Sequence, residues 1–183
     1  MKSRCAVVLF FLTLITSSIS TEAQKSGVYG NFDATNYSQS GNGNSFWTYG
    51  PNAGLYYNFI HVGPVTLGGD LRANYLFGDN YLYRSALIGP RASFKTPTLP
   101  LRPYAQFSFG VGGARGSDIP SVQSRWNNKF HYMIFGGVDM RLTRRFDLRP
   151  VEVGYGRMSQ GSNFHDSIVT VGSGVVFHFK PSE

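Results

Sequence analysis

Residues 65–75 (VTLGGDLRANY) have two chemically opposite faces. Every second residue from Val65 to Tyr75 is apolar or glycine, and the residues between them are polar or glycine, including Asp70 and Arg72. This period of two fits an extended strand and does not fit a helix, whose period is about 3.6 residues. Because side chains at i and i+2 share a face, Asp70 and Arg72 can neutralise each other or charges on neighbouring strands. The pattern predicts a sheet with one apolar and one polar face.

The same alternation recurs along the chain, without any segment of helical periodicity. Eight segments with this pattern are separated by turn residues, and they are residues 27–36, 48–59, 65–77, 83–94, 103–114, 130–142, 148–158 and 167–179. An even number of strands of this length is typical of an antiparallel transmembrane barrel. The sequence therefore predicts an all-β chain that forms a single eight-stranded antiparallel up-and-down transmembrane β-barrel.

Connections between the predicted strands alternate in length, as they do when the two ends of a barrel face different compartments. The long polar connections are residues 38–46, 115–129 and 159–166, and the short ones are residues 60–64 and 143–146. Two connections depart from this alternation. Residues 78–82 are short where a long loop is expected, and residues 95–102 are longer than a tight turn.

The positions of the lysines favour lipid around the barrel. After the N-terminal segment they are Lys25, Lys95, Lys129 and Lys180, and each lies at a strand end, in a turn or in a loop. A charge on a lipid-facing surface near the bilayer midplane costs roughly 2–4 kcal/mol. The alternative, a soluble secreted calyx that binds a small apolar ligand, would carry Lys and Glu along its outer face.

Aromatic residues of the apolar face gather toward the strand ends, where amphipathic rings favour the boundary between hydrocarbon and water. This predicted girdle comprises Trp47, Tyr49, Tyr57, Phe59, Tyr75, Phe77, Tyr81, Tyr83, Phe94, Tyr104, Phe130, Tyr132, Tyr155, Phe177 and Phe179.

Charged residues within the strands fall mainly on the polar face. An eight-stranded barrel is just wide enough to be filled by side chains, so unpaired charges inside it would be costly. The sequence predicts an ion-pair network in the lumen that involves Asp70, Arg72, Arg91, Asp139, Arg141 and Glu152.

The N-terminal segment has the composition of a secretory signal. Lys2 and Arg4 precede an apolar run that is too short to span a bilayer, and small residues stand at positions 21 and 23. We expect residues 1–23 to be cleaved and residues 24–183 to form the barrel domain. The single cysteine, Cys5, lies in the signal, so the mature chain can form no disulfide.

The net charge of +7 raises the question of nucleic acid as a partner. No basic run exceeds two residues and no helical basic face exists, so the sequence predicts no nucleic-acid binding.

Several runs resemble the small bacterial outer-membrane β-barrels of the OmpA-like or opacity-protein type. They are PYAQF with glycines at 110, 112 and 113, GGVD with Arg141, LRPVE at 148–152, and the last strand, IVTVGSGVVFHF. In such proteins a terminal aromatic pair, here Phe177 and Phe179, forms the signal for the barrel-assembly machinery. The resemblance implies a monomer in the bacterial outer membrane, in contact with its lipids, with a structural, adhesive or weakly pore-forming role and no cofactor.

An enzymatic role, as in barrels that modify lipids, remains a distant alternative. His165, Asp166 and Ser167 offer a base, an acid and a hydroxyl, but they straddle a loop end, and no pair of histidines has metal-ligand spacing. We therefore expect no catalysis and no metal. The role is expected in the loops, where an unidentified surface ligand would meet Arg115, Arg125, Trp126 and Lys129.

Overall fold

The computed structural model describes residues 26–38, 45–78, 81–96, 98–116, 128–159 and 165–179. The predicted signal segment lies outside these residues. They form β1 (Ser26–Ser38), β2 (Ser45–Val62), β3 (Val65–Phe77), β4 (Tyr81–Phe94), β5 (Leu101–Gly116), β6 (Lys129–Arg141), β7 (Phe146–Ser159) and β8 (His165–His178). In the part of the chain that is described, no helix is long and apolar enough to cross a membrane.

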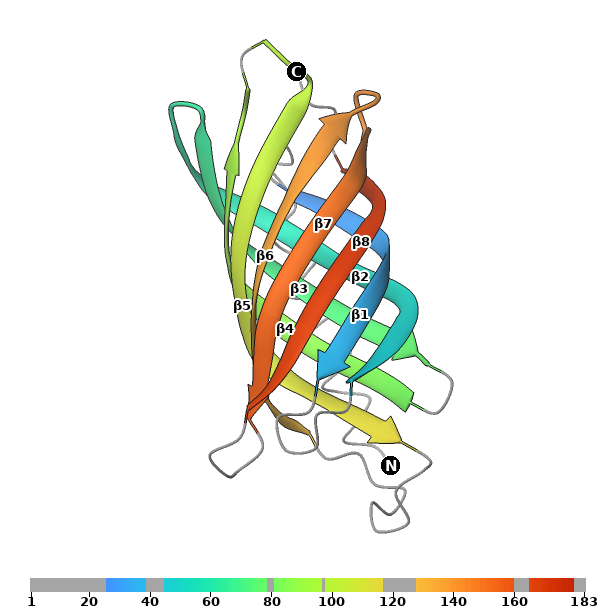
Figure 1. Cartoon of the computed structure of the whole chain (residues 1–183). Helices are drawn as coiled ribbons and strands as arrows, with labels where there is room; N and C mark the ends of the chain where they lie inside the picture. The colour runs from blue at the N-terminus through green and yellow to red at the C-terminus, as the bar shows by residue number, and fades with distance from the viewer. Residues whose placement is uncertain are drawn as a thin grey trace, which may run out of the picture.

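The eight strands close into a barrel in sequence order, with β1 hydrogen-bonded to β8 and every neighbouring pair antiparallel (Figure 1). This confirms the predicted eight-stranded up-and-down barrel. Each predicted strand boundary lies within three residues of the observed one.

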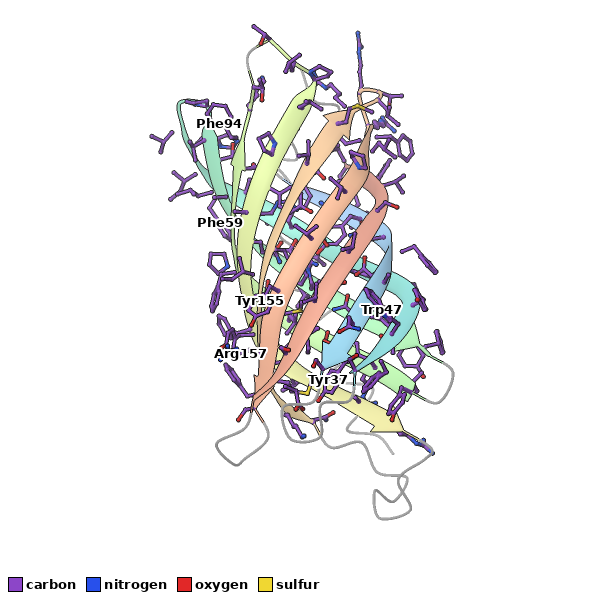
Figure 2. All side chains as sticks on the ribbon, viewed as in Figure 1. Tyr37, Trp47, Phe59, Phe94, Tyr155 and Arg157 are labelled. Atoms are coloured by element: carbon purple, nitrogen blue, oxygen red, sulfur yellow. The ribbon has the colours of Figure 1, made fainter. Side chains whose placement is uncertain are left out.

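The alternation of β3 separates the two surfaces of the barrel as predicted. Leu71 is 44% exposed on the outside, and Asp70 is 2% exposed on the inside. Exposed apolar side chains cover the outer surface over all strands, among them Ile88, Ile134, Val153, Val171 and Val175. Figure 2 shows the aromatic residues Trp47, Phe59 and Phe94 on this surface. The exterior therefore matches an apolar surrounding and not water.

The two ends of the barrel differ in their connections. At one end, which we call the turn end, the strands are joined by Gly63–Pro64, by residues 95–100 and by residues 142–145. Gly63 has a φ of 58°, a conformation that favours glycine. At the other end, the loop end, the connections are residues 39–44, 78–80, 117–128 and 160–164.

The β3–β4 and β4–β5 connections, which depart from the predicted alternation in length, each make a backbone hydrogen bond. Across the short β3–β4 connection, the Gly78 N–H donates to the Tyr81 carbonyl over 2.7 Å. At the turn end the Lys95 N–H donates to the Pro64 carbonyl across 2.8 Å, which ties the β4–β5 connection to the neighbouring hairpin.

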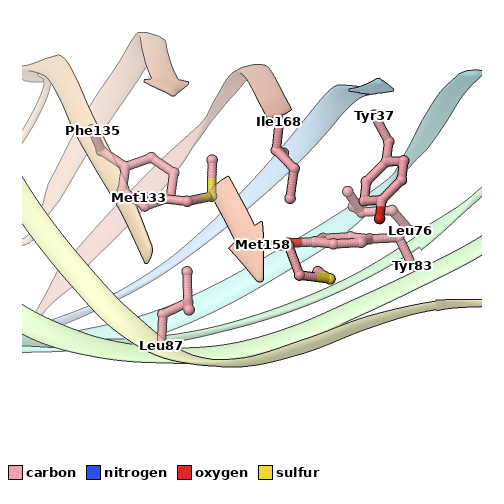
Figure 3. Close-up of a cluster of buried hydrophobic side chains, with 8 residues drawn as sticks. All are labelled: Tyr37, Leu76, Tyr83, Leu87, Met133, Phe135, Met158 and Ile168. Atoms are coloured by element: carbon pink, nitrogen blue, oxygen red, sulfur yellow. The ribbon is translucent and has the colours of Figure 1, made fainter. Parts of the chain in front are cut away.

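An apolar cluster fills the lumen near the loop end. It consists of Tyr37, Leu76, Tyr83, Leu87, Met133, Phe135, Met158 and Ile168, drawn in Figure 3, and each of these side chains is at most 2% exposed. These residues come from six of the eight strands. The lumen toward the turn end is polar instead, and it holds buried arginines and carboxylates.

Candidate functional site

Arg72 of β3 crosses the lumen to Glu152 of β7. Its Nη1 lies 2.8 Å from Glu152 Oε1 and its Nη2 lies 3.0 Å from Glu152 Oε2, so the guanidinium binds the carboxylate through two hydrogen bonds. The same guanidinium lies 3.6 Å from Asp70 Oδ1 through its Nε atom. Charge-assisted pairs of this bidentate kind are the strongest hydrogen bonds in proteins and also fix orientation.

Two further arginines complete a closed ring of charges. Arg149 Nη1 lies 3.1 Å from Glu152 Oε2, and its Nε lies 2.7 Å from Asp139 Oδ1. Arg91 Nη2 lies 2.7 Å from Asp139 Oδ2, and its Nη1 lies 3.7 Å from Asp70 Oδ2. The charges therefore alternate around a ring, in the order Asp70, Arg72, Glu152, Arg149, Asp139 and Arg91. We call these six residues the charged ring.

The charged ring is neutral overall and is packed between aromatic rings. The Arg72 guanidinium carbon lies 3.7 Å from the ring centroid of Phe135, and that of Arg91 lies 3.9 Å from the ring of Tyr104. Arg149 lies between Tyr29 and Tyr104, at 4.5 and 4.6 Å. Such contacts favour a desolvated guanidinium and leave little room beside it.

Polar neighbours donate to two of the three carboxylates of the charged ring. Tyr29 donates to Asp70 Oδ1 across 2.9 Å, Gln106 donates to the same oxygen across 2.7 Å, and Tyr104 donates to Glu152. Because these donors come from β1 and β5, they connect the charged ring to strands that supply none of its members.

Five of the six residues predicted for the lumen network lie in the charged ring. The sixth, Arg141, is half-buried at the end of β6, where its backbone N–H donates to the Pro100 carbonyl. The place of an arginine beside Asp139 is taken by Arg149, which was not among the residues predicted for the network.

A β-bulge explains why Arg149 was missed. Between Arg149 and Glu152 the register with β8 shifts by one residue, so two residues that are three apart both point inward. Simple alternation would place Arg149 and Glu152 on opposite faces. The sequence did hold a signal, since Pro150 within a strand pattern is often the mark of a bulge.

Three tyrosines assigned to the outer girdle instead lie on the inward-facing side of their strands. Tyr81 is half-buried and stacks on Phe46, which packs against the apolar cluster, with ring centroids 3.8 Å apart. Tyr83 is 2% exposed, with its hydroxyl 3.2 Å from His131 Nδ1. Tyr104 is 5% exposed and contacts Glu152. The hydroxyls of Tyr83 and Tyr104 therefore have polar partners inside the barrel.

Space in the lumen is scarce. One cavity, between the polar and apolar parts, is lined by Asp33, Thr35, Asn74 and Thr170 together with members of the apolar cluster, and it holds about 10 Å³. That is room for about one water molecule. A cavity of this volume does not form a continuous passage through the barrel.

Asp166 and Ser167 of the candidate catalytic triplet are separated by the strand itself. Asp166 is buried in the lumen and accepts a hydrogen bond from Tyr37, whereas Ser167 lies on the opposite face of β8. Within the described ranges, no group of three His, Cys, Asp or Glu side chains has the arrangement of a metal site.

The predicted loop contacts lie only partly within the described residues. Arg115 is exposed near the end of β5, and Lys129 is the first residue of β6, both at the loop end. Arg125 and Trp126 lie outside the described residues.

The terminal aromatic pair lies at the turn end of β8. Phe177 and Phe179 have ring centroids 5.8 Å apart, and Phe177 also packs 5.2 Å from Phe146 at the start of β7. Phe179 is exposed on the outer surface.

Neither family models nor curated proteins match the sequence. Solved structures do match the fold. Neisserial surface protein A (NspA) shares 18% identity, with 84% of this chain and 97% of that chain covered and a TM-score of 0.62. Ail, the attachment invasion locus protein of Yersinia pestis, shares 15% identity, covers 84% of this chain and 99% of its own, and has a TM-score of 0.53.

The outer membrane enzyme PagL is similar to the same degree, with 16% identity, 80% of this chain and 98% of that chain covered, and a TM-score of 0.53. Barrels that are enzymes and barrels that are not share this fold. The structural similarity therefore establishes the architecture of the chain, and its chemistry must be argued from its own residues. With its apolar exterior and closed sheet, the chain has the fold of the small eight-stranded barrels of the bacterial outer membrane.

Proposed function

We propose that the protein is an integral outer-membrane barrel that acts at the cell surface through the loops of its loop end, in a structural or adhesive role. The observation that carries this proposal is the filled lumen. The charged ring and the apolar cluster occupy successive levels of the interior, so neither solute transport nor a ligand chamber has room inside the wall. What remains available to a partner is the surface.

The orientation of the barrel supports the assignment to the loops. In outer-membrane barrels the turns are periplasmic and the longer loops are extracellular. The longest connection at the loop end, residues 117–128, joins β5 to β6. It contains Arg125 and Trp126 and is flanked by Arg115 and Lys129, which would suit an anionic partner such as an acidic sugar. Ail has been solved in complex with the heparin analogue sucrose octasulfate, so this fold can present an anion-binding surface.

The soluble calyx is not favoured. A calyx needs an apolar chamber and a water-facing exterior, whereas here the interior is crossed by three arginines and the exterior is apolar. We further propose that the protein has no catalytic activity. The support is that Asp166 and Ser167 face opposite sides of the wall.

We also propose insertion by the barrel-assembly machinery as a monomer. Phe177 and Phe179 would provide the terminal signal, and the exposed aromatic pair at the end of the last strand supports this role. A Phe179→Ala variant should then accumulate outside the membrane, whereas Phe59→Ala, an equally exposed aromatic of another strand, should insert normally.

Two measurements test the proposed function. Carbonate and urea extraction of cell membranes should leave the protein in the membrane pellet, and its release into the supernatant would contradict an integral barrel. Deletion of residues 117–128 should abolish binding of cells to immobilised sulfated polysaccharide without loss of barrel folding. Binding that persists after this deletion would contradict the loop assignment.

A further inference from the structure

Asp33 is a buried carboxylate of β1 that lies outside the charged ring. Its side chain is 2% exposed, and its Oδ2 accepts a hydrogen bond from the Asn52 amide across 2.7 Å. Among the described residues, no Lys, Arg or His side chain forms an ion pair with Asp33, whereas Asp70, Asp139 and Glu152 are each paired with arginine. The charged ring is neutral by itself, so an ionised Asp33 has no counter-charge in that network.

The cavity between the polar and apolar parts of the lumen lies against this carboxylate. Its polar side is formed by four oxygen-bearing residues from β1, β3 and β8, namely Asp33, Thr35, Asn74 and Thr170. The other side belongs to the apolar cluster drawn in Figure 3. With a volume of about 10 Å³, the cavity can hold one particle of the size of a water molecule.

The polar side of the cavity is rich in hydrogen-bond acceptors. The Asn74 amide nitrogen donates to Ser85 Oγ across 2.7 Å, and Thr35 Oγ1 donates to Thr170 Oγ1 across 2.8 Å. No group among the described residues donates to Asp33 Oδ1 or to Asn74 Oδ1, although both atoms are buried. Buried oxygen atoms normally have a partner, so we expect one from outside the chain.

We propose that this cavity binds a monovalent alkali cation, Na⁺ or K⁺, between Asp33 and Asn74. Hard cations take oxygen ligands in proteins, and a single carboxylate balances a single positive charge. A buried carboxylate is stable when it is paired or coordinates a metal ion. A water molecule could donate to the two oxygens, but it would leave the charge of Asp33 uncompensated.

The ligand set favours a monovalent over a divalent cation. Ca²⁺ takes six to eight oxygen ligands, commonly from several carboxylates, and Asp33 is the one carboxylate of this cavity. In the described part of the chain, no cluster of His, Cys, Asp or Glu has the arrangement of a metal site. An alkali cation needs no such cluster, and it would join β1 to β3 across the lumen.

Reversible unfolding of the purified mature protein at different Na⁺ concentrations tests the proposal. The protein is folded into phosphatidylcholine vesicles and unfolded with urea, while NaCl is exchanged for choline chloride at constant total salt and constant pH. Choline is too large for the cavity, so the comparison isolates binding inside it. KCl is exchanged for choline chloride in the same way.

The proposed site predicts how stability depends on the cation. Because the ion would bind the folded barrel and not the unfolded chain, the unfolding equilibrium constant should fall as the concentration of Na⁺ or K⁺ rises. Above the dissociation constant of one site, it should fall by about tenfold for each tenfold increase in concentration.

Three variants locate the ion. Asp33→Asn removes the charge and should abolish the dependence on both alkali cations. Asp166→Asn is the matched control, because Asp166 is a buried lumen carboxylate that does not line the cavity, and it should keep the dependence. Thr170→Val keeps the charge of Asp33 but removes a hydroxyl, so it should need a higher cation concentration for the same stabilisation.

Equal unfolding constants in choline chloride and in both alkali salts would overturn the proposal, because a proton or a water molecule would then be the partner of Asp33. A dependence that Asp33→Asn retains, or that Asp166→Asn loses, would also overturn it. If Asp33→Asn does not fold, an unchanged concentration dependence in Thr170→Val would contradict the site. The loops take no part in this site, so its failure would leave the proposed function unaffected.

Discussion

At the scale of single residues, each lumen arginine is held by carboxylates and by an aromatic ring. Removing one partner from such a buried set is costly, because the remaining charge stays buried without compensation. In β3, the alternation of the sequence was sufficient to place Asp70 and Arg72 inside the barrel and Leu71 outside it. Alternation failed at Arg149 because the bulge changes the face of every residue that precedes it.

The outward position of Leu71 gives the first prediction. Leu71→Arg should lower the free energy of unfolding by roughly 2–4 kcal/mol, because it puts a charge on the lipid-facing surface. Leu71→Phe, which keeps the position apolar, should be nearly neutral. The measurement is a denaturant titration in lipid vesicles, and equal stability of the two variants would contradict the assigned facing.

Glu152 accepts from two arginines of the charged ring, which gives the second prediction. Glu152→Gln should destabilise the barrel by about 3–5 kcal/mol, because Arg72 and Arg149 would lose their shared carboxylate. Asp33→Asn is the control in the same lumen, since the hydrogen bond described for Asp33 comes from the Asn52 amide and not from an arginine. Asp33→Asn should lower the free energy of unfolding by less than Glu152→Gln does. An equal or larger loss would contradict the claim that the charged ring contributes most of the polar stabilisation in the lumen.

At the scale of elements, the bulge in β7 determines which side chains meet in the lumen. Strand number, strand length and the facing of β3 were all available from periodicity, because lipid outside and a filled lumen inside impose a strict two-residue pattern. The bulges were not available in this way, since they interrupt that pattern. The positions of Tyr83 and Tyr104 were also misjudged, because tyrosine suits both a membrane interface and a polar lumen.

The bulge itself can be removed without changing the facing of its neighbours, which gives the third prediction. Deletion of Pro150 would leave Arg149 and Glu152 two apart on a regular strand, so both would still point inward. The variant should therefore fold. Deletion of Val153, in a regular part of β7, should prevent folding, because it moves one segment of the strand to the wrong face.

Heat-modifiable electrophoretic migration after refolding into vesicles distinguishes the two deletions. Failure of the Pro150 deletion together with success of the Val153 deletion would contradict the register of β7.

At the scale of the whole molecule, the barrel is closed in two senses. Its sheet has no free edge, since β1 pairs with β8, and its lumen is filled at two successive levels. Alternation placed Asp70, Asp139 and Glu152 in the lumen, but the sequence did not reveal which arginine meets which carboxylate. That pairing depends on three-dimensional closure, which brings side chains from β3, β4, β6 and β7 together in the lumen.

Planar-bilayer recording of the purified barrel tests the central claim most directly. An interior occupied by the charged ring and the apolar cluster should give no stable, large single-channel steps, at either polarity of the applied voltage. Glu152→Gln should not open a passage either, because its side chain keeps the same volume. Reproducible large steps from the folded, unmodified protein would contradict the filled lumen, and with it the conclusion that the protein acts through its loops.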